Sequence, residues 1–236
     1  MIHFKLTEGI AYYIGRNIET ERHVHHGLEF VFGIDSPFDL ISEKSKLIGI
    51  YGAVINPNYP HQFIGRDAEY LFIYLEPELL QINQIKKHYD LDAQKIVQLS
   101  RLSSFPNAEK VIDFSFFSEV LDINIVHTTI TEIDHRIKSV VEWIKNNLEQ
   151  GQISSDELAK SVFLSTSRFS HLFKEQIGIP LRRYILWCRI LEALRGVLEG
   201  HNLTTSAHAA GFSDSAHFSR TFSEMFGVTP SSVLKK

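Results

Sequence analysis

The stretch AHAAGFSDSAHFSRTF at residues 207–222, followed by Gly227, decides the C-terminal fold. The same pattern occurs earlier as AKSVFLSTSRFSHLF at residues 159–173, followed by Gly178. The initial alanines are 48 residues apart, whereas the matching phenylalanines and glycines are 49 apart, so one residue is inserted in the second turn. A small alanine, a short turn, a helix with aromatics four residues apart and a terminating glycine predict a helix-turn-helix unit. Two such units predict two recognition helices for a DNA duplex.

Composition places the chain among ordinary globular proteins. Its 236 residues, 44% hydrophobic and 22% charged, suffice for one large or two small domains. The single cysteine, Cys188, excludes an intramolecular disulfide framework and fits a reducing compartment. We see neither a signal peptide nor an apolar run long enough to cross a bilayer, and therefore expect a cytoplasmic protein.

Charge is distributed unevenly along the chain. The net charge is −4, but residues 134–236 hold 13 Lys and Arg against 10 Asp and Glu, whereas the first 133 residues hold 11 against 18. This asymmetry predicts a basic module joined to an acidic one, with only the basic module facing phosphate.

The N-terminal part is predicted to be mainly β. Residues 27–34, 46–51 and 70–75 are short β-branched and aromatic runs, and Gly, Pro, Asn and Asp clusters separate them. We expect an α+β protein, with a small cupin-like β-barrel sensor over residues 1–76 and an all-α double helix-turn-helix domain over residues 133–236. Within the latter, Ser154 and Asn202 are predicted helix N-caps.

Residues 77–130 are predicted to form a helical segment. Two apolar stripes repeat at helical spacing: Leu79, Leu80, Ile82, Ile85 and Tyr89, then Val111, Ile112, Phe114, Phe117 and Leu121. Packing onto the barrel explains these stripes, and a dimer interface explains them equally well.

The two recognition helices each have a predicted outward face. Phe169, Phe173, Phe218 and Phe222 must point inward, which leaves the residues about 100° to 180° around each helix for DNA. The candidate DNA-binding residues are Ser167, Ser170, His171, Lys174, Ser215, Ala216, His217, Ser219 and Arg220. Arg220 has the donors for a bidentate contact to guanine. Any one of these residues alone also fits a solvated helix face, and the paired pattern favours DNA contact by the face as a whole.

Residues 133–236 resemble the AraC/XylS family of bacterial transcription regulators. The resemblance is strongest in the pattern that runs from Ala207 through Gly211, Phe218 and Arg220 to Gly227 and Pro230. It implies seven helices with two recognition helices in adjacent major grooves, and the base-reading positions match all the DNA-binding candidates except Lys174. The chain departs from the family pattern at Ser155 and Ser206, where leucine and an aliphatic residue are usual, and at Val233-Leu234.

A histidine pattern marks the N-terminal part. His23, His25 and Glu29, followed later by His61, resemble the metal-binding pattern of cupin barrels, which hold Fe, Mn, Ni or Zn. The glycine that enzyme cupins have shortly before the last histidine is absent. AraC-type sensor domains are cupin-like and often keep a Pro-x-x-x-His turn, here Pro57 to His61, without binding a metal. We therefore expect no metal and no cofactor. His25, Glu29, Tyr51 and His61 are instead the candidate ligand-binding residues.

These observations predict a non-enzymatic, sequence-specific DNA-binding regulator that responds to a small molecule through its N-terminal domain. The expected partners are double-stranded promoter or operator DNA, an unidentified small effector and a second copy of the chain, with RNA polymerase a further candidate. Two alternatives stay open. One is a metal-dependent cupin enzyme with a helical appendage, and the other is an architectural DNA binder without a ligand.

Overall fold

The computed structural model describes residues 3–7, 9–79, 81–103, 105, 112, 114–121, 123 and 133–234. Residues 80, 104, 106–111, 113, 122 and 124–130 of the predicted helical segment lie outside these ranges, among them Leu80 and Val111 of the two apolar stripes. Contacts divide the chain into two compact units, one comprising Met1–His127 and Phe222–Lys236, the other Thr128–Thr221. The boundaries expected from the sequence, at residues 76, 130 and 133, stay a prediction.

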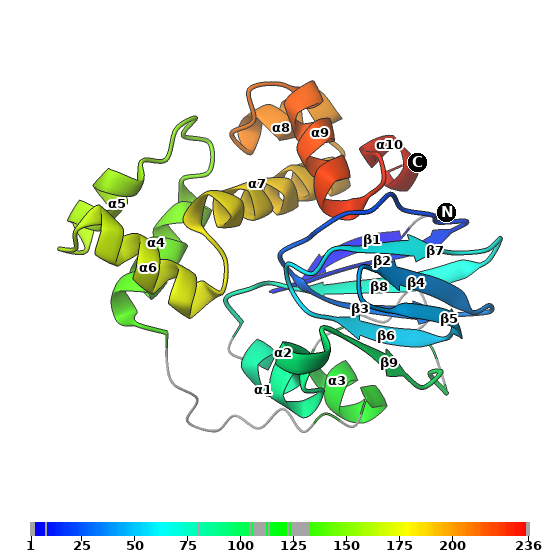
Figure 1. Cartoon of the computed structure of the whole chain (residues 1–236). Coiled ribbons are helices and arrows are strands. Elements are labelled where there is room, and N and C mark those ends of the chain that lie inside the picture. Colours follow the sequence, from blue (N-terminus) through cyan, green and yellow to red (C-terminus); the bar gives the residue numbers. More distant parts are fainter. Residues whose placement is uncertain are drawn as a thin grey trace. The chain divides into compact units, whose positions relative to one another are not determined.

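The first unit contains two antiparallel sheets (Figure 1). The six-stranded sheet has the order β1-β2-β8-β3-β6-β9, and the three-stranded sheet has the order β5-β4-β7. The strands are β1 (His3–Thr7), β2 (Ile10–Arg16), β3 (Leu28–Gly33), β4 (Phe38–Ser42), β5 (Lys46–Ile50), β6 (Gly52–Ile55), β7 (His61–Ile64), β8 (Glu69–Leu75) and β9 (Ile96–Leu99). Among the described residues the two sheets face each other without closing into one hydrogen-bonded barrel, and the predicted α+β class is confirmed.

Successive side chains of a strand point to opposite faces of the sheet, and apolar side chains occupy both faces of the six-stranded sheet. One face, with Phe30, Phe32 and Ile73, packs against α1 (Gln81–His88), α2 (Leu91–Gln94) and α3 (Phe114–Leu121). Ile82 and Ile85 of α1 and Phe117 of α3 lie in this core, so these members of the two predicted stripes cover the sheet. The other face meets the three-stranded sheet, where the rings of Phe72 and Phe63 are 5.0 Å apart.

The second half of the chain is helical, as predicted. Residues 133–234 form α4 (His135–Asn146), α5 (Ser155–Ser161), α6 (Thr166–Ile177), α7 (Leu181–Leu198), α8 (Leu203–Ala209), α9 (Ser215–Phe226) and α10 (Pro230–Val233). These are the seven helices that the family resemblance implied. Ser154 and Asn202 cap α5 and α8 by accepting bonds from Glu157 N and Thr205 N, which confirms both predicted caps.

The long helix α7 organises the second unit. It packs against both α6 and α8, and its buried residues include Tyr184, Trp187 and Leu194. At a rise of 1.5 Å per residue it spans about 27 Å. Cys188 lies buried on this helix. None of the helices in the described part of the chain is long and apolar enough to cross a membrane.

Candidate nucleic-acid interface and histidine cluster

The first helix-turn-helix unit consists of α5 and α6, joined by residues 162–165. Ser165 caps α6, since its Oγ accepts from the backbone N–H of Arg168 at 3.3 Å. Phe169 and Phe173 point inward with their ring centroids 5.9 Å apart, and Phe173 meets Tyr184 of α7 at 5.5 Å. This inward anchoring determines which side of α6 remains outward.

The candidate residues of α6 lie together on that outward side. Ser167, Ser170, His171 and Lys174 are all exposed, whereas Phe169, Leu172, Phe173 and Ile177 are buried. His171 Nδ1 is 3.6 Å from Glu175 Oε2, a surface pair one turn along the helix. The face therefore presents short hydroxyls, one imidazole and one ammonium group.

The second unit consists of α8 and α9, joined by residues 210–214. Its connection is one residue longer than that of the first unit, as the spacing of 49 predicted. Asp214 starts α9, because its Oδ1 accepts from the backbone N–H of His217 at 2.6 Å. Phe212 and Phe218 anchor this unit, with their ring centroids 5.4 Å apart.

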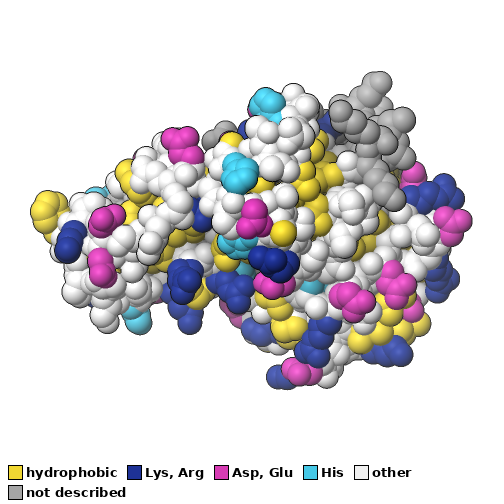
Figure 2. Space-filling model, turned by 90° about the horizontal axis from the view of Figure 1, so that it is seen from above, with side chains coloured by type: hydrophobic (Ala, Val, Ile, Leu, Met, Phe, Trp, Pro, Cys, Tyr) yellow, Lys and Arg dark blue, Asp and Glu magenta, His cyan; other side chains and the backbone are white. Residues whose placement is uncertain are grey.

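The candidate residues of α9 divide into two groups. Ala216 and Arg220 are exposed, whereas Ser215, His217 and Ser219 are half-buried. The His217 ring lies edge-on to Phe212 at 5.2 Å, and Ser219 Oγ donates to the Ser215 carbonyl at 2.8 Å. Arg220 is therefore the long, exposed donor of this face. On the face shown in Figure 2, basic and acidic side chains are interspersed rather than forming one continuous basic surface.

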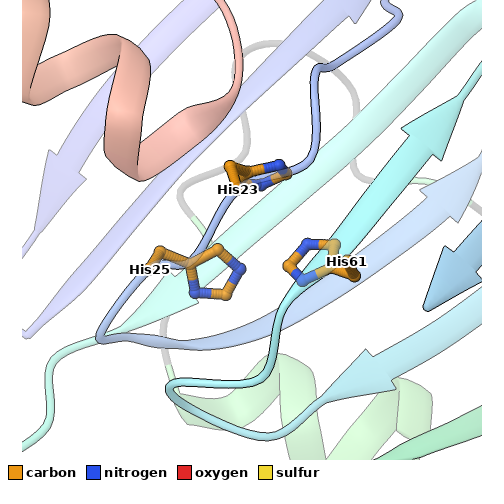
Figure 3. Close-up of side chains that lie close together, drawn as sticks. All are labelled: His23, His25 and His61. Carbon is orange, nitrogen blue, oxygen red and sulfur yellow. The ribbon is translucent and has the colours of Figure 1, made fainter. Parts of the chain in front are cut away.

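A cluster of three histidines lies between the two sheets of the first unit. His23 and His25 come from the segment between β2 and β3, and His61 begins β7 (Figure 3). An isolated bridge joins the backbones of His23 and His61, with N–H to carbonyl distances of 2.9 and 3.1 Å. One ligand nitrogen from each histidine lies within 4.8 Å of the others.

Glu29 of β3 completes this cluster. Its Oε2 is 2.7 Å from His25 Nε2 and 3.2 Å from His61 Nε2. Burial alone would raise the pKa of Glu29, but the charge and hydrogen bonds of His25 and His61 hold it well below its usual range. Burial, with the neighbouring imidazoles, lowers the pKa of His23 to about 3. Burial also raises the pKa of Tyr74, whose ring lies edge-on to His25 at 5.1 Å.

The structure brings together three of the four predicted ligand-binding residues. His25, Glu29 and His61 form one cluster, whereas Tyr51 lies elsewhere, with the guanidinium carbon of Arg101 4.6 Å from its ring centroid. His23 joins the cluster although it was not among the four candidates. Its spacing of two residues from His25 indicated that both side chains share one face, but this inference requires a regular strand, and His23 lies outside one.

Comparisons with known proteins agree with the helical half of the chain. Residues 158–236 match the model of a helix-turn-helix domain family. The chain is 25% identical over 221 residues to the probable transcriptional regulator LumQ of Photobacterium leiognathi, covering 88% of this chain and 89% of LumQ. It is 33% identical over 98 residues to the transcriptional activator RhaS of Pectobacterium carotovorum, covering 41% of this chain and 35% of RhaS.

The fold of the whole chain also has a solved counterpart. ToxT from Vibrio cholerae, in a crystal structure with bound unsaturated fatty acid, superposes with a TM-score of 0.56 at 13% sequence identity. The superposition covers 95% of this chain and 94% of ToxT, so the two-part α+β architecture is shared. With its duplicated helix-turn-helix units, the helical half of the chain is of the type found in the AraC/XylS family, and the chain is similar to DNA-binding transcriptional regulators and activators.

Proposed function

We propose that the protein reads a specific promoter or operator sequence with the outward faces of α6 and α9. The observation that carries this proposal is the matched pair of capped, aromatic-anchored helices, one with exposed Ser167, Ser170, His171 and Lys174 and the other with exposed Ala216 and Arg220. Half-buried Ser215, His217 and Ser219 complete the predicted face. Two such helices read adjacent major grooves when they dock on one side of a duplex.

The test is selection of binding sites from a random duplex library, followed by titration of the selected duplex by fluorescence anisotropy. A sequence-specific regulator binds the selected duplex roughly 10³-fold or more tightly than random DNA, and its affinity falls with salt as phosphate contacts are lost. An architectural binder without specificity would hold both duplexes equally. Such a result would overturn the proposal.

We further propose that the first unit is a sensor and that the protein acts in the cytoplasm as a homodimer on DNA. ToxT, which shares the fold, has been solved with a bound fatty acid, and this supports a sensor role for the unit. His25, Glu29, Tyr51 and His61 stay candidate ligand residues. Sedimentation of the protein with and without the selected duplex tests the dimer, since a complex with one chain per duplex would contradict it.

The family relationship favours a non-enzymatic role, and RNA polymerase remains a candidate partner. The competing proposal is a metal-dependent enzyme in the first unit. The burial of His23, His25, Glu29 and His61, each at most 5% exposed, disfavours turnover of an organic substrate at this cluster. Transcription from a promoter that carries the selected site, measured with purified RNA polymerase, separates a regulator from an enzyme.

A further inference from the structure

We propose that His23, His25, His61 and Glu29 bind one divalent first-row transition-metal ion in a closed structural site that ties the two sheets together. This proposal concerns the first unit alone and does not depend on the DNA-binding role of the helices. It reverses the expectation of a metal-free site and rests on the geometry of the cluster.

The tautomer of each histidine is determined by its backbone partner. His23 Nδ1 lies 2.9 Å from the Glu21 carbonyl, His25 Nδ1 lies 2.8 Å from the Gly27 carbonyl, and His61 Nδ1 lies 2.9 Å from the Tyr59 carbonyl. A carbonyl oxygen only accepts, so each Nδ1 must carry the hydrogen.

The metal-facing nitrogen of each ring follows from this assignment. A neutral imidazole with its hydrogen on Nδ1 has a lone pair on Nε2. Metal-binding histidines in proteins are oriented in this way, with the second ring nitrogen donating to a carbonyl or carboxylate. The three Nε2 atoms are therefore prepared as ligands.

The position of Glu29 makes a cation at this place favourable. Its Oε2 approaches Nε2 of His25 and of His61, and in the neutral tautomers both nitrogens direct lone pairs at the carboxylate. A positive charge must lie between them, because a buried carboxylate against lone pairs is strongly unfavourable. Without an ion, that charge is a proton on Nε2 of His25, which donates to Glu29 Oε2 at 2.7 Å. A divalent ion replaces this proton and takes the nitrogens and the carboxylate as ligands. Imidazole and carboxylate ligands suit Zn²⁺, Fe²⁺, Mn²⁺ and Ni²⁺.

Small movements suffice to form the coordination sphere. The three nitrogen ligands lie within 4.8 Å of one another. Metal–nitrogen bonds of about 2.1 Å in a tetrahedral site place neighbouring ligands about 3.4 Å apart, so the rings need to move inward by roughly 1 Å. His23 and His25 lie in a connection between strands rather than within a ladder, and such a segment can make this adjustment.

The burial of the ligands indicates a structural rather than a catalytic ion. Exposure is 5% for His23, 1% for His25, 2% for Glu29 and 1% for His61. Structural sites fill all their positions with protein ligands, whereas catalytic sites keep one open. Glu29 belongs to the six-stranded sheet and His61 to the three-stranded sheet, so the ion would connect the two.

The experiment uses the full chain, treated with EDTA and then titrated with Zn²⁺ alone. We expect one equivalent of zinc per chain by elemental analysis after gel filtration, and a higher melting temperature with zinc than without it. His61→Ala should weaken zinc binding at least about 100-fold and abolish the thermal shift. The matched control is His26→Ala, because His26 is similarly buried but its Nδ1 bonds Asn58 Oδ1 instead of facing the cluster.

Three results would overturn the proposal. The first is less than a tenth of an equivalent of zinc in the wild-type protein, and the second is equal loss of zinc in His26→Ala and His61→Ala. If His61→Ala fails to fold, Glu29→Gln keeps the side-chain shape and must still weaken binding. The third is a Co²⁺-substituted protein whose visible spectrum is that of six-coordinate rather than four-coordinate cobalt, which would contradict a closed site.

Discussion

The turns of the two helix-turn-helix units share one backbone conformation, but a large aromatic residue stands in one turn where glycine stands in the other. Phe163 in the first turn and Gly211 in the second occupy the matching position, four residues after the alanine that begins the repeated pattern, Ala159 or Ala207. Both backbones are left-handed, with φ of 57° and 83°. The Phe163 side chain is 96% exposed, whereas a Cβ at Gly211 would lie 2.1 Å from the Leu148 carbonyl oxygen.

This difference shows that backbone conformation and packing constrain a turn separately. The second turn is held against the end of α4 and the middle of α7, where Arg189 Nη2 donates to the Gln150 and Gly151 carbonyls at 2.8 and 3.1 Å. Only glycine fits there. The first turn faces solvent, so it accepts a phenylalanine, although the left-handed conformation costs an L-residue about 1–2 kcal/mol.

The largest expected effect is that of Gly211→Ala. The new methyl group would collide with backbone, which cannot move as a side chain can, and the backbone is left-handed. We expect the free energy of unfolding to fall by about 3 kcal/mol or more, as measured by urea denaturation. The matched change Phe163→Ala removes a solvent-exposed ring and should stay within about 0.5 kcal/mol of wild type. Equal losses in the two variants would contradict the contrast.

The second-largest expected effect is on DNA binding, where Arg220 of α9 should contact a base and Lys174 of α6 should contact a phosphate. Arg220→Ala should cost about 1–3 kcal/mol of binding free energy on the selected duplex and little on random DNA, because a bidentate base contact is lost. Lys174→Ala should weaken binding to both duplexes alike and reduce the salt slope by about 1, as expected for a phosphate contact. Anisotropy titrations at several salt concentrations measure both quantities. If Arg220→Ala behaves like Lys174→Ala, α9 makes no base contact through this residue.

Helices were predictable from the sequence because their signals are local. The caps at Ser154 and Asn202, the glycine ends and the aromatic spacing each act within a few residues. Even the departure at Ser206 has a local reason. This residue is buried in α8, its Oγ donates to the Asn202 carbonyl at 3.1 Å, and it packs against Gly196 of α7.

Sheet topology was less predictable, because strand pairing depends on residues far apart in the sequence. The predicted runs at 27–34 and 46–51 contain β3 and β5, and the run at 70–75 covers β8 except for its first residue, Glu69. The strands β4, β6, β7 and β9 have only four or five residues each, too few for a clear alternation. In addition, β9 follows two helices yet pairs with β6. Moreover, the alternation of apolar and polar residues along a strand is the same in a closed barrel and in two facing sheets, so it does not distinguish the two architectures.

The histidine cluster shows the same limit. The spacing of His25 and Glu29 and the distant His61 indicated a shared site, and these side chains do meet. Tyr51 was grouped with them as a polar residue expected to face inward from a β run, but it follows β5 directly, and a register change of one residue reverses the face of a side chain. His23 reaches the cluster through its bridge to His61, a pairing across 38 positions that no local pattern shows.

A smaller effect is expected from reducing the backbone strain at Phe163 in the first turn. Asparagine adopts the left-handed conformation more readily than phenylalanine does. It also loses less conformational entropy on folding than glycine would at this position. Phe163→Asn should therefore raise the free energy of unfolding by about 0.5–1 kcal/mol in urea denaturation. Phe163→Ala removes the same ring but keeps the unfavourable backbone, and serves as the control. If both variants match wild type, the left-handed turn carries no measurable strain.

The smallest effect distinguishes the caps of the two recognition helices by pH. Ser165 does not titrate, whereas Asp214 has its pKa lowered by the backbone N–H of His217 and by the hydroxyl of Ser213. A depressed pKa in the folded state means that the cap stabilises the protein above the unfolded value of about 3.9 and loses this contribution as the pH falls through the lower folded value. The urea midpoint of wild type should therefore fall more steeply than that of Asp214→Ser between about pH 5 and pH 3. The reciprocal variant Ser165→Asp should steepen the profile, because it gives α6 the same titrating cap. Parallel profiles for all three proteins would show that the two units are capped with equal strength at every pH.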